Sequence, residues 1–317
     1  MISRRLLRSL TRGRPVLALI VGLAAADCGT EATDVSGPDD RQPAPLLSSG
    51  SPPFAVGVAT GVYFACAVKS DGSLPCWGDD AGGTATPPEG QFTQVAAGYF
   101  HSCAIKTDAT VACWGFGESG ETTPPAEAFT KVSAGAGFTC GIQSDATIGC
   151  WGYDDGGRTS PPEGTFVDLS LFSAHGCAIR TDGTLACWGL NDHGVASPPA
   201  GTFARVSTGE THTCGIRTDG GLQCWGYNED GRATPPEGTF TEVGAGMYHT
   251  CAIRTSGTLA CWGPPDAPGG TRPPGGTFTQ VSSQQYYSCG VRTHGLVDCW
   301  GSNSHGQSSP FPELVGH

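Results

Sequence analysis

Fourteen of the fifteen cysteines form seven pairs whose members stand ten positions apart. Thiols at a fixed spacing can form a disulfide, contribute ligands to zinc, or remain as buried free thiols. The chain has no CxxC sequence, the ligand spacing of many zinc sites, so we expect disulfides ahead of the two alternatives. The expected bridges are Cys66–Cys76, Cys103–Cys113, Cys140–Cys150, Cys177–Cys187, Cys214–Cys224, Cys251–Cys261 and Cys289–Cys299.

Hairpin geometry accounts for the spacing of ten. In CAIRTDGTLACWG (177–189), the TDG triplet fits a three-residue loop closed by Gly183 in a left-handed conformation. Counting outward from this loop pairs Cys177 with Cys187 on a non-hydrogen-bonded rung, where Cα atoms are about 4.5 Å apart. Two repeats have alanine in place of the glycine, which strains the expected turn.

Four histidines occupy one repeat position, which Phe or Tyr fills in the other three repeats. Because aromatic rings replace them, we expect core packing for these histidines rather than metal binding or base catalysis. The positions are His101, His175, His212 and His249, with Phe64, Phe138 and Tyr287 as the replacements.

Two acidic loops, YDDGG (153–157) and YNEDG (227–231), lack the third spaced carboxylate and the distal Glu of a calcium loop. Turn formation explains their composition. The sequence therefore predicts no metal ion and no cofactor.

Segments that depart from the repeat are the places to look for catalysis: LSLFSAH (169–175), GPPDAPGG (263–270) and SSQQYYS (282–288). None of them combines a nucleophile with a base, or two carboxylates at a recognisable spacing. We expect that the protein is not an enzyme.

A repeat of 37 or 38 residues positions all these residues, and Trp-Gly follows the second cysteine each time. Apolar residues alternate with period two, as in FTQVAAG (92–98), which predicts three antiparallel strands per unit. Both faces of such a sheet carry small or apolar residues, as burial between two like sheets requires. We predict an all-β, seven-bladed propeller of three-stranded blades with one disulfide per blade. An open solenoid is the alternative, although its terminal repeats would need polar caps.

In this meander, the loop after the first strand and the loop after Trp-Gly lie at the same edge of the sheet. Aromatic residues mixed with Asn and acids on a rigid scaffold are typical of protein-binding surfaces. Packing of the rings between blades is the alternative. The partner-binding residues that we predict are Tyr63, Tyr99, Phe100, Phe116, Tyr153, Asp154, Tyr227, Asn228, Tyr248 and Tyr286.

The first 26 residues have the layout of a signal peptide, with five arginines ahead of an apolar run. Cleavage after Ala26 and lipidation of Cys28, the one cysteine outside the pairs, are the two alternatives for its end. Residues 27–53 show no periodic pattern of apolar residues, which predicts a flexible linker. The propeller is expected over 54–308, and 309–317 as a closing segment against the first blade.

Loss of residues 1–26 removes five arginines and no acid from a chain of 17 Lys/Arg and 29 Asp/Glu, leaving a balance of about −17. Such a charge excludes nucleic acid and an anionic membrane surface as partners. Membrane contact is expected only through a lipid on Cys28.

The consensus around VGAGMYHTCAIRTSGTLACWG (243–263) resembles the regulator of chromosome condensation repeat. The short period resembles that of the secreted bacterial propeller family of beta-lactamase inhibitor protein II, which lacks these cysteines. The resemblance covers everything after residue 53 and implies the propeller fold. The eukaryotic family member acts on a small GTPase and DNA through an inserted wedge and a basic side. Neither feature is present here, so no small GTPase partner is expected.

Together these observations predict an exported, monomeric interaction module in a bacterial envelope or outside the cell, with an unknown protein as partner. Inhibition of a beta-lactamase or penicillin-binding enzyme is one alternative, and binding or cleavage of a glycan is another.

Overall fold

The computed structural model describes residues 52–264 and 270–315. The predicted signal peptide, Ala26, Cys28 and nearly all of the predicted linker lie outside the described residues. Within those residues, no helix is long and apolar enough to cross a membrane.

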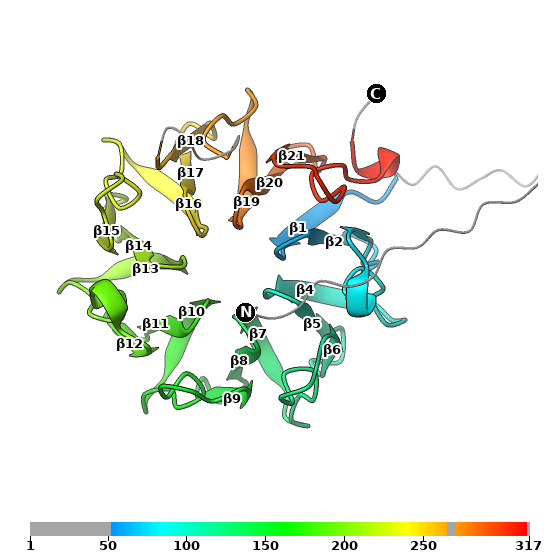
Figure 1. The fold of residues 1–317 in the computed structure, drawn as a ribbon, viewed down its shortest axis with the longest axis horizontal. Helices are drawn as coiled ribbons and strands as arrows, with labels where there is room; N and C mark the ends of the chain where they lie inside the picture. The colour runs from blue at the N-terminus through cyan, green and yellow to red at the C-terminus, as the bar shows by residue number, and fades with distance from the viewer. Residues whose placement is uncertain (1–51, 265–269, 316–317) are drawn as a thin grey trace, which may run out of the picture. The chain divides into compact units, whose positions relative to one another are not determined.

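Seven three-stranded antiparallel sheets form a ring of blades, each made of consecutive strands (Figure 1). The first strand of each blade lies nearest the centre of the ring. The predicted propeller is therefore confirmed. The blades are β1 (Ala55–Thr60), β2 (Phe64–Lys69) and β3 (Cys76–Gly78); β4 (Phe92–Ala97), β5 (His101–Lys106) and β6 (Val111–Gly115); β7 (Phe129–Ala134), β8 (Phe138–Gln143) and β9 (Ile148–Gly152); β10 (Phe166–Phe172), β11 (His175–Arg180) and β12 (Leu185–Gly189); β13 (Phe203–Thr208), β14 (His212–Arg217) and β15 (Leu222–Gly226); β16 (Phe240–Ala245), β17 (Thr250–Arg254) and β18 (Leu259–Trp262); β19 (Phe278–Ser283), β20 (Tyr287–Arg292) and β21 (Val297–Gly301). Three 3-10 turns complete the elements: η1 (Ala81–Gly83), η2 (Asp192–Gly194) and η3 (Pro312–Leu314).

The cysteine hairpin has the predicted register. Cys177 pairs with Cys187, and the loop between them is closed by Gly183 at φ 86°. All seven predicted disulfides are present, with Cα–Cα distances of 4.0 to 4.1 Å. Ala109 and Ala146 replace this glycine in two blades and adopt φ of 68° and 70°, a conformation that costs an L-residue energy.

Neighbouring blades meet through one recurring apolar unit. Between the fourth and fifth blades, Cys177 and Ile179 pack against Phe203, Val206 and Trp225. Each disulfide thus lies against the next blade's first strand and tryptophan. Close packing of this kind, repeated around the ring, is the main source of cohesion.

Every tryptophan also links two blades, because its Nε1 donates a hydrogen bond to a main-chain oxygen in the preceding blade's last loop. The seven bonds run from Trp114 to Thr84, Trp151 to Glu121, Trp188 to Arg158, Trp225 to Val195, Trp262 to Arg232, Trp300 to Gly270 and Trp77 to Gln307, over 2.8 to 3.1 Å.

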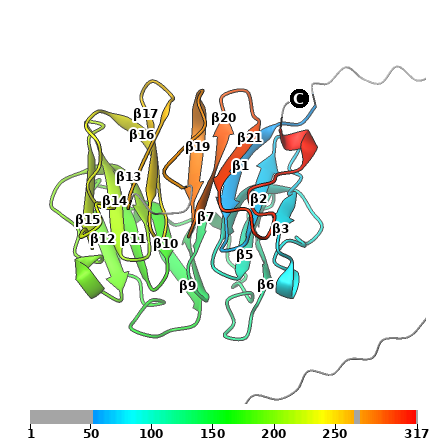
Figure 2. The same cartoon turned by 45° about the horizontal axis from the view of Figure 1, so that its top comes forward.

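The first and last blades share no strand, and both side-chain and main-chain bonds close the ring, among them Ala55 N to Gly295 O at 2.8 Å. Gln280 of β19 accepts the Val58 N–H at 2.8 Å through Oε1, which satisfies an edge of β1. On the outside, the C-terminal segment with η3 lies beside β1 and β2 (Figures 1 and 2). There Leu314, 1% exposed, joins a cluster with Ala55 and Trp77. Ala55 takes the place that Phe occupies in the other first strands, and Leu314 supplies apolar volume to this junction.

Leu314→Ala should lower the free energy of unfolding by about 2–5 kcal/mol, because it leaves a cavity at the junction of the first and last blades. Glu313→Ala, an exposed change in the same turn, is the control and should stay within about 0.5 kcal/mol. Urea unfolding of both variants checks the prediction, and equal stability would contradict it.

Candidate functional site

In the part of the chain that the structure describes, two sets of loops meet along one edge of the blades and form what we call the loop face. One set comprises the turns after the first strands (61–63, 98–100, 135–137, 173–174, 209–211, 246–249 and 284–286). The other comprises the loops after the third strands (79–84, 116–121, 153–158, 190–195, 227–232 and 302–307). Main-chain bonds join the sets, as where Phe116 N donates to Phe100 O at 2.9 Å. The predicted gathering of both sets is confirmed.

At the centre of the loop face, Tyr99 donates a hydrogen bond to Glu210 Oε2. These residues belong to the second and fifth blades, on opposite sides of the ring in Figure 1. Burial and the Glu210 charge raise the pKa of Tyr99, so the phenol stays a neutral donor. Its ring also contacts Phe172, with centroids 5.5 Å apart. Tyr99 therefore connects the second blade with the fourth and fifth, an internal contact that the prediction of partner binding did not include.

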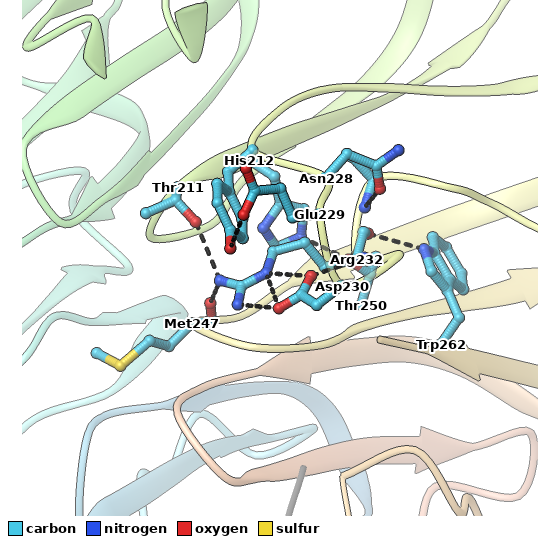
Figure 3. Close-up of polar contacts among 11 residues, drawn as sticks. Thr211, His212, Asn228, Glu229, Asp230, Arg232, Met247, Thr250 and Trp262 are labelled. Atoms are coloured by element: carbon cyan, nitrogen blue, oxygen red, sulfur yellow. Dashed lines mark hydrogen bonds and ion pairs between the residues drawn. The ribbon is translucent and has the colours of Figure 1, made fainter. Parts of the chain in front are cut away.

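The internal cation Arg232 lies close to two of the predicted tyrosines, and Figure 3 shows its bonds to Asp230 and Met247. The guanidinium carbon of Arg232 lies 5.0 Å from the Tyr227 ring centroid and 5.4 Å from that of Tyr248. Arg232 also donates to Asp230 Oδ1 at 2.9 Å and to the Met247 carbonyl at 2.8 Å. Hydrogen bonding from Arg232 lowers the pKa of Asp230. The pair is ionised, and Arg232 is only 7% exposed.

The third blade repeats this arrangement with Arg158. Its guanidinium carbon lies 5.1 Å from the Tyr153 ring centroid and 5.8 Å from that of Phe138. Arg158 Nε donates to the Asp155 carbonyl at 2.9 Å. Sequence reasoning had not singled out either arginine, although both stand five positions after the aromatic residue that follows Trp-Gly.

Between the first two blades, the loop face has an apolar pocket of about 380 Å³. Four of its eight lining residues, Tyr63, Tyr99, Phe100 and Phe116, were predicted to bind a partner. Phe100 and Phe116 are 49% and 44% exposed, and their ring centroids are 6.1 Å apart at 79°. The other lining residues are Phe64, Asp79, Ala81 and Thr84.

The remaining predicted residues lie apart from this pocket. Tyr286 stacks on Tyr248 with ring centroids 5.1 Å apart. Asp154 and Asn228 use side-chain oxygens inside their own loops, where they accept the main-chain N–H groups of Thr159 at 3.2 Å and Ala233 at 3.0 Å. These bonds support turn formation as the reason for the Asn/Asp-rich loops. Across the described ranges, no group of three or more His, Cys, Asp or Glu side chains could hold a metal ion.

The four repeat-position histidines lie in the core beneath the loop face and are at most 2% exposed. Each places Nε2 near a hydroxyl of the next blade, as His101 does with Thr139 Oγ1 at 2.7 Å; the other pairs are His175–Thr213, His212–Thr250 and His249–Ser288. Burial lowers the pKa of His101, His175 and His249 to about 4 and that of His212 to about 3. The histidines are therefore neutral at pH 7 and connect blades, as their exchange with aromatic residues indicated.

Comparison with known families identifies the repeat. The regulator of chromosome condensation (RCC1) repeat matches residues 92–121, 173–195, 203–232 and 278–307. Four segments of this chain thus match the RCC1 repeat. Each matched segment begins at or near a blade's first strand, or in the turn after it, and continues into the loop after the third strand. Among curated proteins, no sequence gives a significant match.

Solved structures share the fold of this chain. The CRINKLY WD40 ectodomain of the Arabidopsis thaliana receptor kinase ACR4 is 24% identical, with a TM-score of 0.69, over 83% of this chain and 100% of that one. The ectodomain of the Physcomitrella patens receptor kinase CR4 is 22% identical, with a TM-score of 0.67, over 79% and 74%. Prp20p of Saccharomyces cerevisiae is 15% identical, with a TM-score of 0.61, over 70% and 74%.

Proposed function

We propose that the protein is a non-enzymatic interaction module that works outside the cytoplasm and binds a partner protein through its loop face. The observation that carries the proposal is the open aromatic pocket between the first two blades, rimmed by Phe100 and Phe116. Half-exposed aromatic side chains beside a concave apolar surface are typical anchors of protein interfaces.

The seven disulfides support a location outside the cytoplasm, because such bonds persist in oxidising compartments. That two neighbours in fold are receptor-kinase ectodomains agrees with such a location. We further propose that the signal peptide directs the chain to a bacterial envelope, with either release after Ala26 or a lipid on Cys28.

The scaffold favours recognition because its loop face is held rigidly. Each blade has its own disulfide and a tryptophan bonded to its neighbour, so binding orders few additional groups. The loops therefore form a binding surface that already has its shape before the partner binds.

A cross-linking pull-down from the native envelope and culture medium tests the proposal. We expect the parent protein to capture a partner that Phe100→Ser/Phe116→Ser fails to capture. Val167→Ser is the matched control, because Val167 is a 62% exposed apolar residue at the opposite end of a first strand. The captured protein, purified and titrated against the three forms, should keep the same order of affinity. Equal affinity for all three forms would refute the proposal.

A further inference from the structure

One repeat position decides what lies between the aromatic rings of the loop face. It is the residue whose carbonyl accepts the tryptophan bond from the next blade. In the third and fifth blades this residue is Arg158 or Arg232, and its guanidinium lies against two aromatic rings. In the first blade it is Thr84.

Thr84 holds the same main-chain place as Arg232. The Thr84 carbonyl accepts the Trp114 indole bond at 3.0 Å, and the Arg232 carbonyl accepts that of Trp262 at 2.9 Å. The short Thr84 side chain turns inward and donates to the Asp79 carbonyl at 2.8 Å. The space that a longer side chain would take is therefore left to the aromatic pocket, which Thr84 itself lines.

The aromatic lining follows the same correspondence. Phe100 immediately precedes His101, as Tyr248 precedes His249, so it holds the position from which Tyr248 covers Arg232. Phe64, which also lines the pocket, holds in the first blade the position of Phe138, whose ring centroid lies 5.8 Å from the Arg158 guanidinium carbon. Phe116 comes from the second blade and completes the aromatic lining. The pocket thus has aromatic walls like those that hold a guanidinium elsewhere in this chain, without an internal cation.

The charge of the loop face favours a cation in this place. In the described loops of this face, the only Lys or Arg residues are Arg158 and Arg232, both of which form ion pairs. Asp79, the acidic residue of the pocket lining, accepts the Ala81 main-chain N–H at 3.0 Å through Oδ1. The acidic residues of the loop face are Asp79, Asp80, Glu118, Glu121, Asp154, Asp155, Asp192, Glu210, Glu229 and Asp230.

We propose that the pocket between the first two blades binds the guanidinium group of an arginine side chain supplied by the partner protein. This proposal rests on the proposed interaction function and specifies which chemical group of the partner is bound. The planar guanidinium stacks on the Phe100 and Phe116 rings, and Asp79 pairs with its charge. The aliphatic stem of the arginine covers the remaining apolar wall.

Titration of the protein with Nα-acetyl-arginine methylamide tests this proposal. Fluorinated phenylalanine is incorporated into the protein, and its NMR signals report binding. The citrulline counterpart is the matched control ligand, since it has nearly the same shape without the charge. We expect saturable binding on the order of millimolar Kd for the arginine probe and about fivefold weaker binding for citrulline. Equal binding of the two probes, or no saturable binding of the arginine probe, overturns the proposal.

Three variants test whether the arginine probe binds in this pocket. Phe116→Leu and Asp79→Asn should each weaken the arginine probe about fivefold, and Leu190→Ala, at the position of Phe116 in the fourth blade, should leave its affinity unchanged. Leucine at position 116 reproduces the residue found at Leu190, so the variant should fold. Affinity unchanged in Phe116→Leu overturns the proposal.

Thr84→Arg should abolish probe binding, because the new side chain can occupy the pocket as Arg232 occupies its own. Should this variant not fold, Phe116→Leu and Asp79→Asn decide the question. The outcome is separable from that of the interaction function. A partner lost in Phe100→Ser/Phe116→Ser without any arginine-probe binding overturns only the arginine proposal. Probe binding without a captured partner supports the pocket and contradicts the interaction function.

Discussion

Reduction of the seven disulfides is expected to unfold the propeller near room temperature. Each bridge closes a loop between cysteines ten residues apart, which in the chain-entropy model is worth about 3 kcal/mol. Even a partial sum over the seven bridges then reaches the whole net stability of a typical domain, about 5–15 kcal/mol. Circular dichroism melts of protein equilibrated with and without a phosphine reductant measure the effect. An unchanged midpoint after complete reduction, verified by mass spectrometry, would show that packing alone holds the blades.

A single bridge provides the control for this result. Cys177→Ala/Cys187→Ala should lower the free energy of unfolding by about 2–3 kcal/mol while leaving the other six bridges in place. The Cys177 side chain is fully buried against the next blade, so alanine there also leaves a small cavity. A loss much below 2 kcal/mol would indicate that the unfolded chain gains little freedom.

Acid is expected to destabilise the propeller through its buried histidines. Burial holds the pKa of His101, His175 and His249 at about 4 and that of His212 at about 3, below the ordinary value of 6.5. Above pH 6.5 both states are neutral and the full stability is present. As the pH falls from 6.5 towards the folded pKa, only the unfolded chain gains protons, and stability is lost. Each histidine contributes a slope of about 1.4 kcal/mol per pH unit and a total of about 3 kcal/mol.

Urea unfolding at about pH 7 and about pH 5 measures this loss. His101→Phe is the matched variant, because Phe64 and Phe138 occupy the same repeat position in other blades. The variant should lose one histidine's share of the pH dependence while staying folded. Exposed Asp71, Asp108 and Asp182, whose pKa values are lowered mainly by neighbouring hydroxyl groups, titrate below this window. The same pH dependence in parent and variant would refute the assignment.

Local chemistry made the blade predictable from sequence. A TDG loop fixes the register that brings Cys177 to Cys187, and alternation then sends Trp188 to the opposite face. At Gly176, which pairs with Trp188, an added Cβ would lie 2.5 Å from Leu171 and 2.6 Å from the indole ring. Repetition of one pattern seven times left few architectures besides a closed ring.

The loop face was predictable only in part. Its location followed from the meander, and four of the predicted residues line one pocket. The bond from Tyr99 to Glu210 joins residues 111 positions apart in loops that do not repeat, so no periodicity could reveal it. The role of Thr84 was equally unpredictable. Its short side chain is informative only by comparison with Arg158 and Arg232, which hold the same repeat position in other blades.

The tryptophan bonds have an evolutionary consequence. Their acceptors are main-chain oxygens, so the junction places no demand on the accepting side chain, and the seven acceptors are Thr84, Glu121, Arg158, Val195, Arg232, Gly270 and Gln307. Mutations at this position can therefore change the chemistry of one inter-blade site without altering the bond between the blades. A single ring can in this way diversify its specificity site by site, while selection for folding acts on other residues.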